Sequence, residues 1–360
     1  MEEFLRNYGW QILFLILVLS TILYLGVYYI RLVFRGKETS SDSEKKTPKK
    51  SKNRVITIAV TVAIAELLSW FSIYKWEEYG IVLFVLIPLL IMGVFPVIVV
   101  GRKEELTFKK AMELGLIILG YYIAILFVFA LEGAICIIMY LPIAVGLVIL
   151  GNYLGYLLVK KRKNNNVTLC LIFFSLPITG YIEKGKEFTQ NVVSTQIEIH
   201  ADEQTVWQYL VTFPKFDKPT ELILKTGIAY PLNGQIKDTP NGKIIDCEFT
   251  TGRFVGEINE WKENKLIQFT VKEQPQSMKE LSLWDIEPPH VNAYFNCEKG
   301  LFKLTKLPNG NVLLEGKTWY RHQIRPNAYW KFWSNYVMDK VHSRVLTYVK
   351  ENAEKQNGGR

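Results

Sequence analysis

The chain has few of the side chains on which metal binding and nucleophilic catalysis depend. Its 360 residues include four cysteines and four histidines. The cysteines form no CxxC pair or other metal-binding spacing, and the histidines are dispersed, with no Ser–His–Asp order. The sequence therefore predicts no metal, no cofactor and no catalytic triad.

A nucleic-acid partner is disfavoured too, although the net charge is +9. Most of the excess positive charge lies between long apolar runs in the first half of the chain. From residue 184 onward, acidic and basic residues are nearly balanced. Because the chain has no basic stripe and no nucleic-acid motif, we expect no nucleic-acid binding.

Long apolar runs occur only in residues 1–183, which are predicted to form a membrane region. A helix needs roughly 20 apolar residues to cross a bilayer. Six segments reach or approach this length, and the last of them is short. The predicted spans are residues 10–30, 55–74, 81–100, 111–131, 134–159 and 168–182.

The positions of lysine and arginine predict the orientation of these spans. Three alternate loops, at 31–54, 101–110 and 160–163, hold nearly all the basic residues of the membrane region. The positive-inside rule places these loops in the cytoplasm, and the N-terminus and the C-terminal domain outside. If 168–182 does not cross, the domain is cytoplasmic. Residues 34–54 are charged and rich in Ser and Lys, so we expect them to be disordered.

The predicted topology bears on four isolated side chains. Glu66 and Glu132 lie in or beside apolar spans, where a carboxylate is costly and is a candidate for function. They are too few to outline a transport pathway, and the alternative is that each faces a neighbouring helix or the interface. An outside location permits a disulfide between Cys247 and Cys297, with two free thiols as the favoured alternative.

After residue 190 the pattern becomes that of a globular α+β domain. Alternating apolar residues at 193–199 predict a half-buried strand, and Asp202 is a predicted N-cap for the helix that follows. About six short strands come next, with Asn-Gly turns at 240–242 and 308–310. A long amphipathic helix begins at Pro326 and ends near Glu354, and residues 355–360 form a tail.

The stretch "DCEFTTGRFVGEINEW", residues 246–261, raises the possibility of a catalytic cluster because it is rich in carboxylates. Alternation places Cys247 and Phe249 on one face of a strand, and Asp246 and Glu248 on the other. A hairpin connected through Thr251-Gly252-Arg253 is therefore the preferred interpretation.

The stretch "IEIHADEQTVWQYLVTFPKF" is similar to the opening strand and helix of a known domain. This domain is that of the START-like helix-grip superfamily, also called SRPBCC, which includes polyketide cyclases and lipid-transfer domains. Further stretches resemble a bacterial subgroup that fuses this domain to a multi-span membrane region. They are "GIAYPLNGQI", "CEFTTGRFV", "QPQSMKE", "PPH", "LEGKTWY" and "YWKFWS", together with "LEGAICIIMYLP" in the membrane half. The resemblance covers about 190–354 and implies a curved antiparallel sheet around the long C-terminal helix, in a multi-pass protein of the bacterial cell membrane.

The resemblance also implies an apolar cavity between sheet and helix, of the kind that binds lipids or other hydrophobic small molecules. The alternative is that the aromatic residues form an ordinary core. Residues 275–291 are long for a strand connection and are a candidate lid, or else a rigid surface loop. The predicted ligand-binding residues are Phe249, Phe254, Phe269, Trp284, Leu314, Tyr320, Trp330, Trp333 and Val337.

The sequence leaves three functions open and favours binding over catalysis. The first is a membrane-anchored domain that binds a lipid or another hydrophobic molecule. The second is a cyclase-like or dehydratase-like enzyme, and the third is a structural or sensor protein with a filled core. Acid–base candidates for the enzyme are His290, His322, His342, Glu280 and Glu315, of which Glu315 is expected to face away from the cavity.

Overall fold

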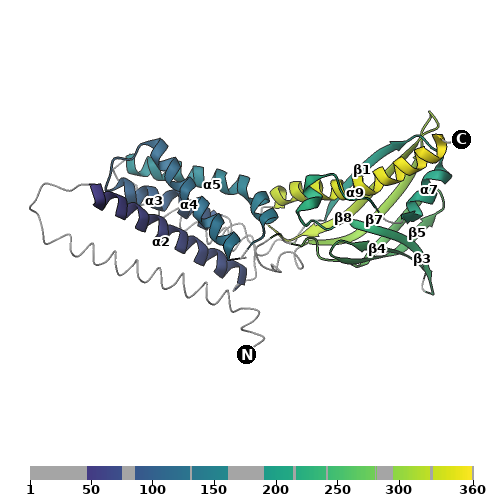
Figure 1. Cartoon of the computed structure of the whole chain (residues 1–360), viewed down its shortest axis with the longest axis horizontal. Helices are drawn as coiled ribbons and strands as arrows, with labels where there is room; N and C mark the ends of the chain where they lie inside the picture. The colour runs from purple at the N-terminus through teal and green to yellow at the C-terminus, as the bar shows by residue number, and fades with distance from the viewer. Residues whose placement is uncertain are drawn as a thin grey trace, which may run out of the picture. The chain divides into compact units, whose positions relative to one another are not determined.

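The computed structural model divides into two compact units, and the boundary between them in the sequence is near residue 186 (Figure 1). The first unit is helical, and the second consists of a sheet with helices. The predicted spans 10–30 and 168–182 lie outside the described residues, as does most of the segment 275–291. The structure describes residues 47–74, 86–129, 132–160, 190–213, 216–240, 242–279, 281, 295–324 and 327–358.

The helical unit contains four described helices, each of which overlaps one predicted span. Two of them, α4 and α5, are long and apolar enough to cross a membrane; among the described residues no other helix meets both conditions, and α3 is a shorter apolar helix. The helices are α2 (Thr47–Tyr74), α3 (Ile87–Gly101), α4 (Phe108–Val128) and α5 (Ala134–Lys160).

Helix α2 begins at Thr47, so it includes the last residues of the segment 34–54 that is expected to be disordered. Pro48 fits the first turn of a helix, and lysine is a good helix former, so the helix extends beyond the apolar run. Arg54 also forms an ion pair with Glu104, with 2.6 Å between Nη2 and Oε2. The charged composition of residues 34–54 therefore does not show where the loop ends and α2 begins.

Small residues let α3 and α5 approach each other closely. A Cβ atom on Gly93 would lie 2.7 Å from backbone atoms of Gly151 and Asn152. On Gly155, a Cβ atom would lie 3.1 Å from the Val94 carbonyl oxygen. Close backbone contact at small residues is typical of helices that pack inside a membrane.

The second unit is built on one antiparallel sheet of eight strands, in the order β1-β8-β7-β6-β5-β4-β3-β2. Consecutive strands from β2 to β8 are neighbours, and β1 pairs with β8 at the edge. The strands are β1 (Asn191–Ile199), β2 (Thr212–Phe213), β3 (Pro231–Thr239), β4 (Gly242–Phe249), β5 (Gly252–Lys262), β6 (Leu266–Glu273), β7 (Phe295–Lys306) and β8 (Val312–His322).

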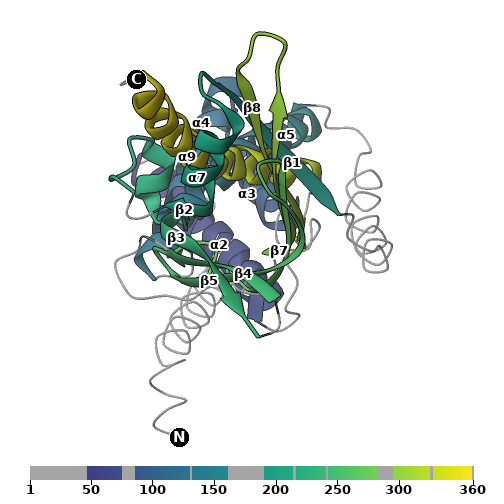
Figure 2. The ribbon, with the colours of Figure 1, turned by 90° about the vertical axis from the view of Figure 1, so that its right-hand side faces the viewer.

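The sheet curls around a long C-terminal helix, α9 (Asn327–Gly358), as Figure 2 shows. A short helix, α7 (Glu203–Val211), packs on α9, and the single turn η2 (Leu222–Thr226) also touches it. Asp202 caps α7 as predicted, because its Oδ1 atom accepts a hydrogen bond from the Thr205 backbone N–H at 2.8 Å. A curled antiparallel sheet that holds one long helix is the helix-grip architecture. Helix α9 continues beyond its predicted end at Glu354.

The hydrophobic core lies under the C-terminal half of α9. Four side chains of this half are almost fully buried: Val345, Leu346, Val349 and Ala353. They pack against residues of β1, α7, β6 and β8, such as Val206, Trp207, Ile267 and Leu314. This end of the domain is filled by its own side chains.

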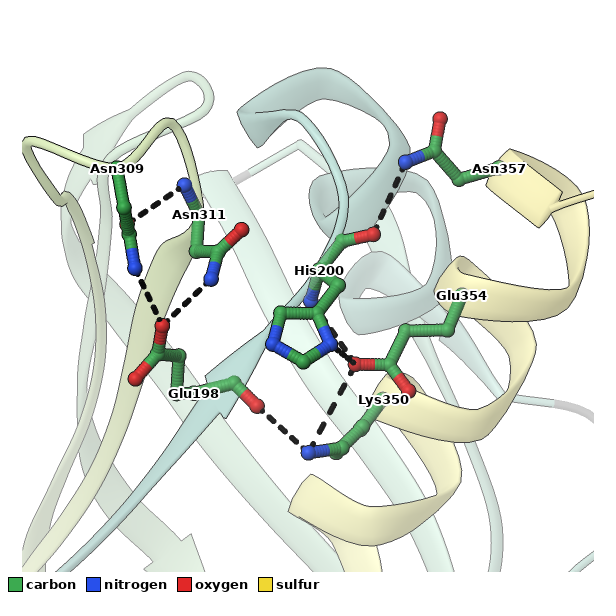
Figure 3. A network of polar contacts seen from close by, with 7 residues as sticks. All are labelled: Glu198, His200, Asn309, Asn311, Lys350, Glu354 and Asn357. Atoms are coloured by element: carbon green, nitrogen blue, oxygen red, sulfur yellow. Dashed lines mark hydrogen bonds and ion pairs between the residues drawn. The ribbon is translucent and has the colours of Figure 1, made fainter.

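A polar network joins the same end of α9 to the sheet (Figure 3). The amides of Asn309 and Asn311 both donate to Oε1 of Glu198, at 2.9 and 2.5 Å. Lys350 donates to the carbonyl oxygen of Glu198 at 2.9 Å, so β1, the β7–β8 turn and α9 are held at one point. The network comprises Glu198, His200, Asn309, Asn311, Lys350, Glu354 and Asn357.

Candidate functional site

A chain of phenylalanine rings crosses the concave face of the sheet. The ring centroids of Phe249 and Phe254 are 5.5 Å apart, and those of Phe254 and Phe269 are 6.1 Å apart. Phe302 extends the chain at 6.4 Å from Phe269. The structure thus brings together three predicted site residues from β4, β5 and β6 and adds a fourth ring from β7.

Two glycines make room for the central ring of this chain. A Cβ atom on Gly300 would lie 2.1 Å from the Phe269 ring, and one on Gly256 would lie 2.6 Å from it. Both distances are far inside van der Waals contact. The Phe269 ring therefore lies directly on the backbones of β5 and β7, on either side of its own strand.

Packing differs between the two halves of α9. None of the described residues from Asn327 to Val341 is fully buried, although Trp330, Trp333 and Val337 are apolar. Phe249 and Phe254, on the sheet, are also only partly buried. The predicted site residues of α9 are therefore only partly buried, and Phe249 and Phe254 of the β4–β5 hairpin pack against the margin of the core.

Leu314 and Tyr320 lie on the inward face of β8 and are fully buried. The Tyr320 hydroxyl donates to Oδ1 of Asn335 at 2.7 Å, which ties β8 to α9. Its ring stacks on Phe295 with centroids 5.2 Å apart. Burial raises the pKa of Tyr320 to about 12, so the phenol stays protonated and acts as a hydrogen-bond donor.

Trp333 lies on a different side of α9 from the residues that contact β1 and β8. It precedes His342 by nine residues, which is about two and a half helical turns. Because His342 touches β1 and β8, Trp333 points away from these two strands. Its indole nitrogen is buried and has no hydrogen-bond partner among the described residues.

His342 is a structural bridge between α9 and two strands. Its Nδ1 lies 3.2 Å from the Thr195 hydroxyl on β1, and its Nε2 lies 2.8 Å from the Thr318 hydroxyl on β8. Burial lowers the pKa of His342 to about 4, and the charge of Asp339 opposes this effect only in part. The ring is therefore neutral near pH 7, and both nitrogens are engaged, so it is not available for proton transfer.

His322, the other described histidine of the predicted acid–base set, has a different environment. It is 1% exposed, and neither ring nitrogen has a hydrogen-bond partner of normal geometry in the described part of the chain. Its ring lies 6.1 Å from that of Tyr320. Burial is the main cause that lowers its pKa, which favours a neutral imidazole with one donor and one acceptor.

The carboxylates singled out in the sequence have structural partners outside the concave face. Glu315 accepts from the Ser194 hydroxyl at 2.6 Å and pairs with Lys317 at 2.9 Å. Its prediction as an outward-facing residue is confirmed. Glu280, Trp284 and His290 lie outside the described residues.

The stretch "DCEFTTGRFVGEINEW" is a hairpin, as predicted, although its turn is earlier. Gly252 pairs with Phe249, so the connection is Thr250-Thr251 and β5 begins at Gly252. Asp246 forms ion pairs across the strands with Arg253 at 2.8 Å and with Lys237. Hydrogen bonds from these two cations hold its pKa at about 2, so Asp246 is a structural anion.

The disulfide between Cys247 and Cys297 is absent, because both thiols are free. Cys247 is on β4 and Cys297 is on β7, with β5 and β6 between them. Strands are roughly 4.8 Å apart, so three steps separate the two residues by about 14 Å. This is well beyond the Cα separation that a disulfide spans.

Two contributors to this region, Phe295 and Phe302, were not predicted as site residues. A β-bulge between Cys297 and Lys299 shifts the alternation of β7. Residues of odd number before the bulge and of even number after it therefore face inward. Only the pairing of β7 with β8 reveals this shift.

Comparison with solved structures finds START-type proteins. One is a START superfamily protein from Mycobacterium smegmatis, at 12% identity, covering 46% of this chain and 98% of that one, with a TM-score of 0.29. Another is norcoclaurine synthase from Thalictrum flavum, at 9% identity, covering 48% and 99%, with a TM-score of 0.30. The protein XoxI from Bacillus cereus is 12% identical, covering 47% and 98%, also with a TM-score of 0.30.

No family model and no curated protein sequence matches the chain. At such TM-scores the structural matches carry no weight for the fold, which rests on the strand order and on the position of α9 within the curled sheet. Chemically, the concave face offers aromatic surface, one phenol and one neutral imidazole. These groups bind apolar molecules and form hydrogen bonds. The described residues hold no cluster of His, Cys, Asp or Glu that is arranged for a metal.

Proposed function

We propose that this protein is a membrane-anchored helix-grip protein that binds a lipid or another hydrophobic small molecule between the sheet and the first half of α9. The supporting observation is the difference between the two halves of that helix. The second half is buried in a filled core, whereas Trp330 and Val337 of the first half are only partly buried, as are the rings of Phe249 and Phe254 on the sheet. Apolar surface that the protein does not itself cover favours an apolar ligand.

The helical unit supports a membrane location for this binding. Helices α4 and α5 have the length and apolar composition of membrane spans, and the further apolar segments of the first 183 residues extend the proposal to a multi-pass anchor. The distribution of lysine and arginine supports a location of the helix-grip domain on the outer face, provided that residues 168–182 cross the membrane. A domain held at a bilayer has a ready source of ligand, and burial of each methylene contributes about 0.8 kcal/mol.

The proposal is tested with the full chain in lipid nanodiscs and a hexadecanol analogue that carries a photoreactive diazirine on its tail. After illumination, mass spectrometry of peptides locates the attached probe. We expect labelling in β4, β5 and the first half of α9. Helices that span a bilayer are labelled by a membrane-dissolved probe whether or not the helix-grip domain binds it. Labelling confined to α4 and α5 would therefore contradict the proposal.

A matched pair of variants makes the test specific. Val337→Trp adds bulk on the first half of α9 and is expected to reduce labelling several-fold. Val192→Trp adds the same bulk on β1, where Val192 is 43% exposed beside Trp319 on the outer face, and should leave labelling unchanged. Equal labelling of both variants would indicate that the core of the domain is filled and that the domain has a structural or sensor role.

Binding is favoured over a cyclase-like or dehydratase-like reaction by the state of the histidines. Both nitrogens of His342 are engaged by threonines. His322 has no carboxylate or other acid–base partner in the described part of the chain. Proton transfer of the usual kind needs a group that takes or supplies the proton within hydrogen-bond reach.

A further inference from the structure

Exposed apolar side chains cover one face of α4 and one face of α5, two helices that pack on each other. They include Leu116, Ile117 and Val128 on α4, and Ile138, Ile149 and Leu150 on α5. The axis of α4 from Phe108 to Val128 is about 30 Å long, because each helical residue adds about 1.5 Å. This length equals the thickness of the hydrocarbon layer of a bilayer, so lipid is the occupant that these faces fit.

Three aromatic rings join the two helices at one end of these faces. Phe108 is the first residue of α4, and its ring centroid lies 6.3 Å from that of Tyr153 and 5.6 Å from that of Tyr156, both on α5. Phe108 is 46% exposed and Tyr153 is 47% exposed. Tyrosine is enriched where a membrane meets water, because its ring is apolar and its hydroxyl is polar. The cluster therefore has the composition and the position of a membrane interface.

Two lysines of α4 lie at the same end. Lys109 and Lys110 follow Phe108 directly and are exposed. They precede the exposed Leu116 and Ile117 by seven positions each, which is about two helical turns, so each lysine shares a side of the helix with one apolar residue. The apolar face of α4 therefore begins at two ammonium groups.

A third lysine completes the group from α5. The Nζ atom of Lys160 lies over the ring of Tyr156, 5.9 Å from its centroid. Lys160 is seven positions after Tyr153 and is exposed, so these two residues share one side of α5. No lysine or arginine occurs in the sequence between Lys110 and Lys160. The positive charge of α4 and α5 is therefore confined to the end that carries the aromatic cluster.

The three lysines have little negative charge to balance them. Within the described parts of the chain none of them forms an ion pair, whereas Arg54 of α2 pairs with Glu104 at 2.6 Å. Glu113 is the one acidic residue in the sequences of α4 and α5. This end of the two helices therefore keeps a positive charge that a negatively charged partner can balance.

We infer that Lys109, Lys110 and Lys160 bind the phosphate of an anionic phospholipid whose acyl chains lie along the exposed faces of α4 and α5. Each ammonium donates to phosphate oxygens, and the charges of both groups strengthen these hydrogen bonds. A zwitterionic lipid has a cation beside its phosphate, which the three ammonium groups repel, so a head group with a net negative charge binds more tightly. Basic groups between membrane helices commonly form lipid head-group sites. The inference rests on the membrane location in the proposed function and does not need a ligand in the grip.

The test uses the full chain in detergent, freed of lipid, and measures the binding of single lipid molecules by native mass spectrometry. Phosphatidylglycerol and phosphatidylcholine with the same acyl chains are titrated separately. A lysine close to an anionic lipid raises the affinity about fivefold. We therefore expect the three lysines together to favour phosphatidylglycerol by about ten- to a hundredfold.

Three variants make the test specific. Lys109→Gln and Lys160→Gln should each reduce the preference for phosphatidylglycerol about fivefold. Both residues are exposed, so neither change disturbs the packing of the helices. Lys306→Gln is the matched control, because it removes the same charge from an exposed residue at the end of β7, in the helix-grip domain. Its preference should equal that of the unmodified protein.

The outcomes separate this inference from the location on which it rests. Equal affinity for the two lipids would overturn the head-group inference alone. A preference for phosphatidylglycerol that Lys109→Gln and Lys160→Gln retain in full would overturn it too. If neither lipid binds and the chain stays dissolved without detergent, the membrane location in the proposed function fails, and this inference fails with it.

Discussion

Protonation of His342 should destabilise the helix-grip domain at acid pH. The imidazole is 7% exposed, lies between the hydroxyls of Thr195 and Thr318, and has a pKa of about 4 against an ordinary value of 6.5. In the unfolded chain this histidine binds a proton near pH 6.5, whereas in the folded domain it binds one only near pH 4. Stability is therefore fully present above about pH 6.5 and is lost as the pH falls towards 4.

The size of this loss follows from the two pKa values. A difference of about 2.5 pH units corresponds to about 3 kcal/mol, at 1.36 kcal/mol per unit. Most of it develops early: between pH 7 and pH 5 the loss from this one residue is about 2 kcal/mol. Asp339, whose carboxylate accepts from Thr195 at 2.7 Å, is the charged group next to the ring, and its attraction for an imidazolium is already included in the pKa of about 4.

Hydrogen–deuterium exchange of the full chain measures this effect locally. Protection of peptides from β1 and from the second half of α9 is followed between pH 7 and pH 5, with correction for intrinsic exchange. His342→Gln keeps a hydrogen-bonding group near Thr318 and does not titrate. The stability that this variant loses between pH 7 and pH 5 should therefore be smaller than that of the unmodified protein by about 2 kcal/mol. His200→Gln is the control, because the side chain of His200 is 66% exposed. If the unmodified protein and His342→Gln lose the same stability between pH 7 and pH 5, the reasoning is refuted.

Three further outcomes are expected. Gly300→Ala places a methyl group 2.1 Å from the Phe269 ring and should lower the free energy of unfolding by about 1–3 kcal/mol in chemical denaturation; an unchanged midpoint would show that the ring moves freely. Asp202→Ala removes the cap of α7 and should cost about 1 kcal/mol, seen as faster exchange of that helix, whereas Asp202→Asn should retain most of the protection. The thiol of Cys247 is buried and that of Cys297 is partly buried, and burial raises the pKa of each to about 12, so both should react with an alkylating reagent much faster after unfolding, with or without reductant; a reductant-dependent mass would reveal a disulfide that the strand order excludes.

Locally encoded features of the fold were predictable from the sequence. Alternation located β1, and a single capping residue, Asp202, located the start of α7. The strand order was not predictable, because pairing between β1 and β8 joins residues more than 100 positions apart, such as Ile197 and Leu314. The rejected disulfide is one consequence, since only the strand order separates the two cysteines.

Some features of the candidate site could not be predicted from the sequence, and the reason is physical. The apolar stripe on α9 predicts that Trp330, Trp333 and Val337 take part in the site, and this assignment stays a prediction. Helix α9 packs on more than one neighbour, and its side-chain hydrogen bonds to β8 are made by the polar residues Asn335 and His342. Polar residues at helical spacing usually face solvent, so the sequence pattern pointed away from the groups that join helix and strand.

The polar network at the end of α9 determines how this helix can move. Glu198 and its partners fasten the helix near Lys350, and the buried residues Val345 to Ala353 pack beside this fastening. A displacement that opens the first half of α9 must therefore pivot at its C-terminal end. From Asn327 to Lys350 the helix is about 35 Å long, so a tilt of about 5° displaces its first turn by about 3 Å. A small rotation at a fixed end thus becomes a displacement of about 3 Å at the other end, with every hydrogen bond inside the helix intact.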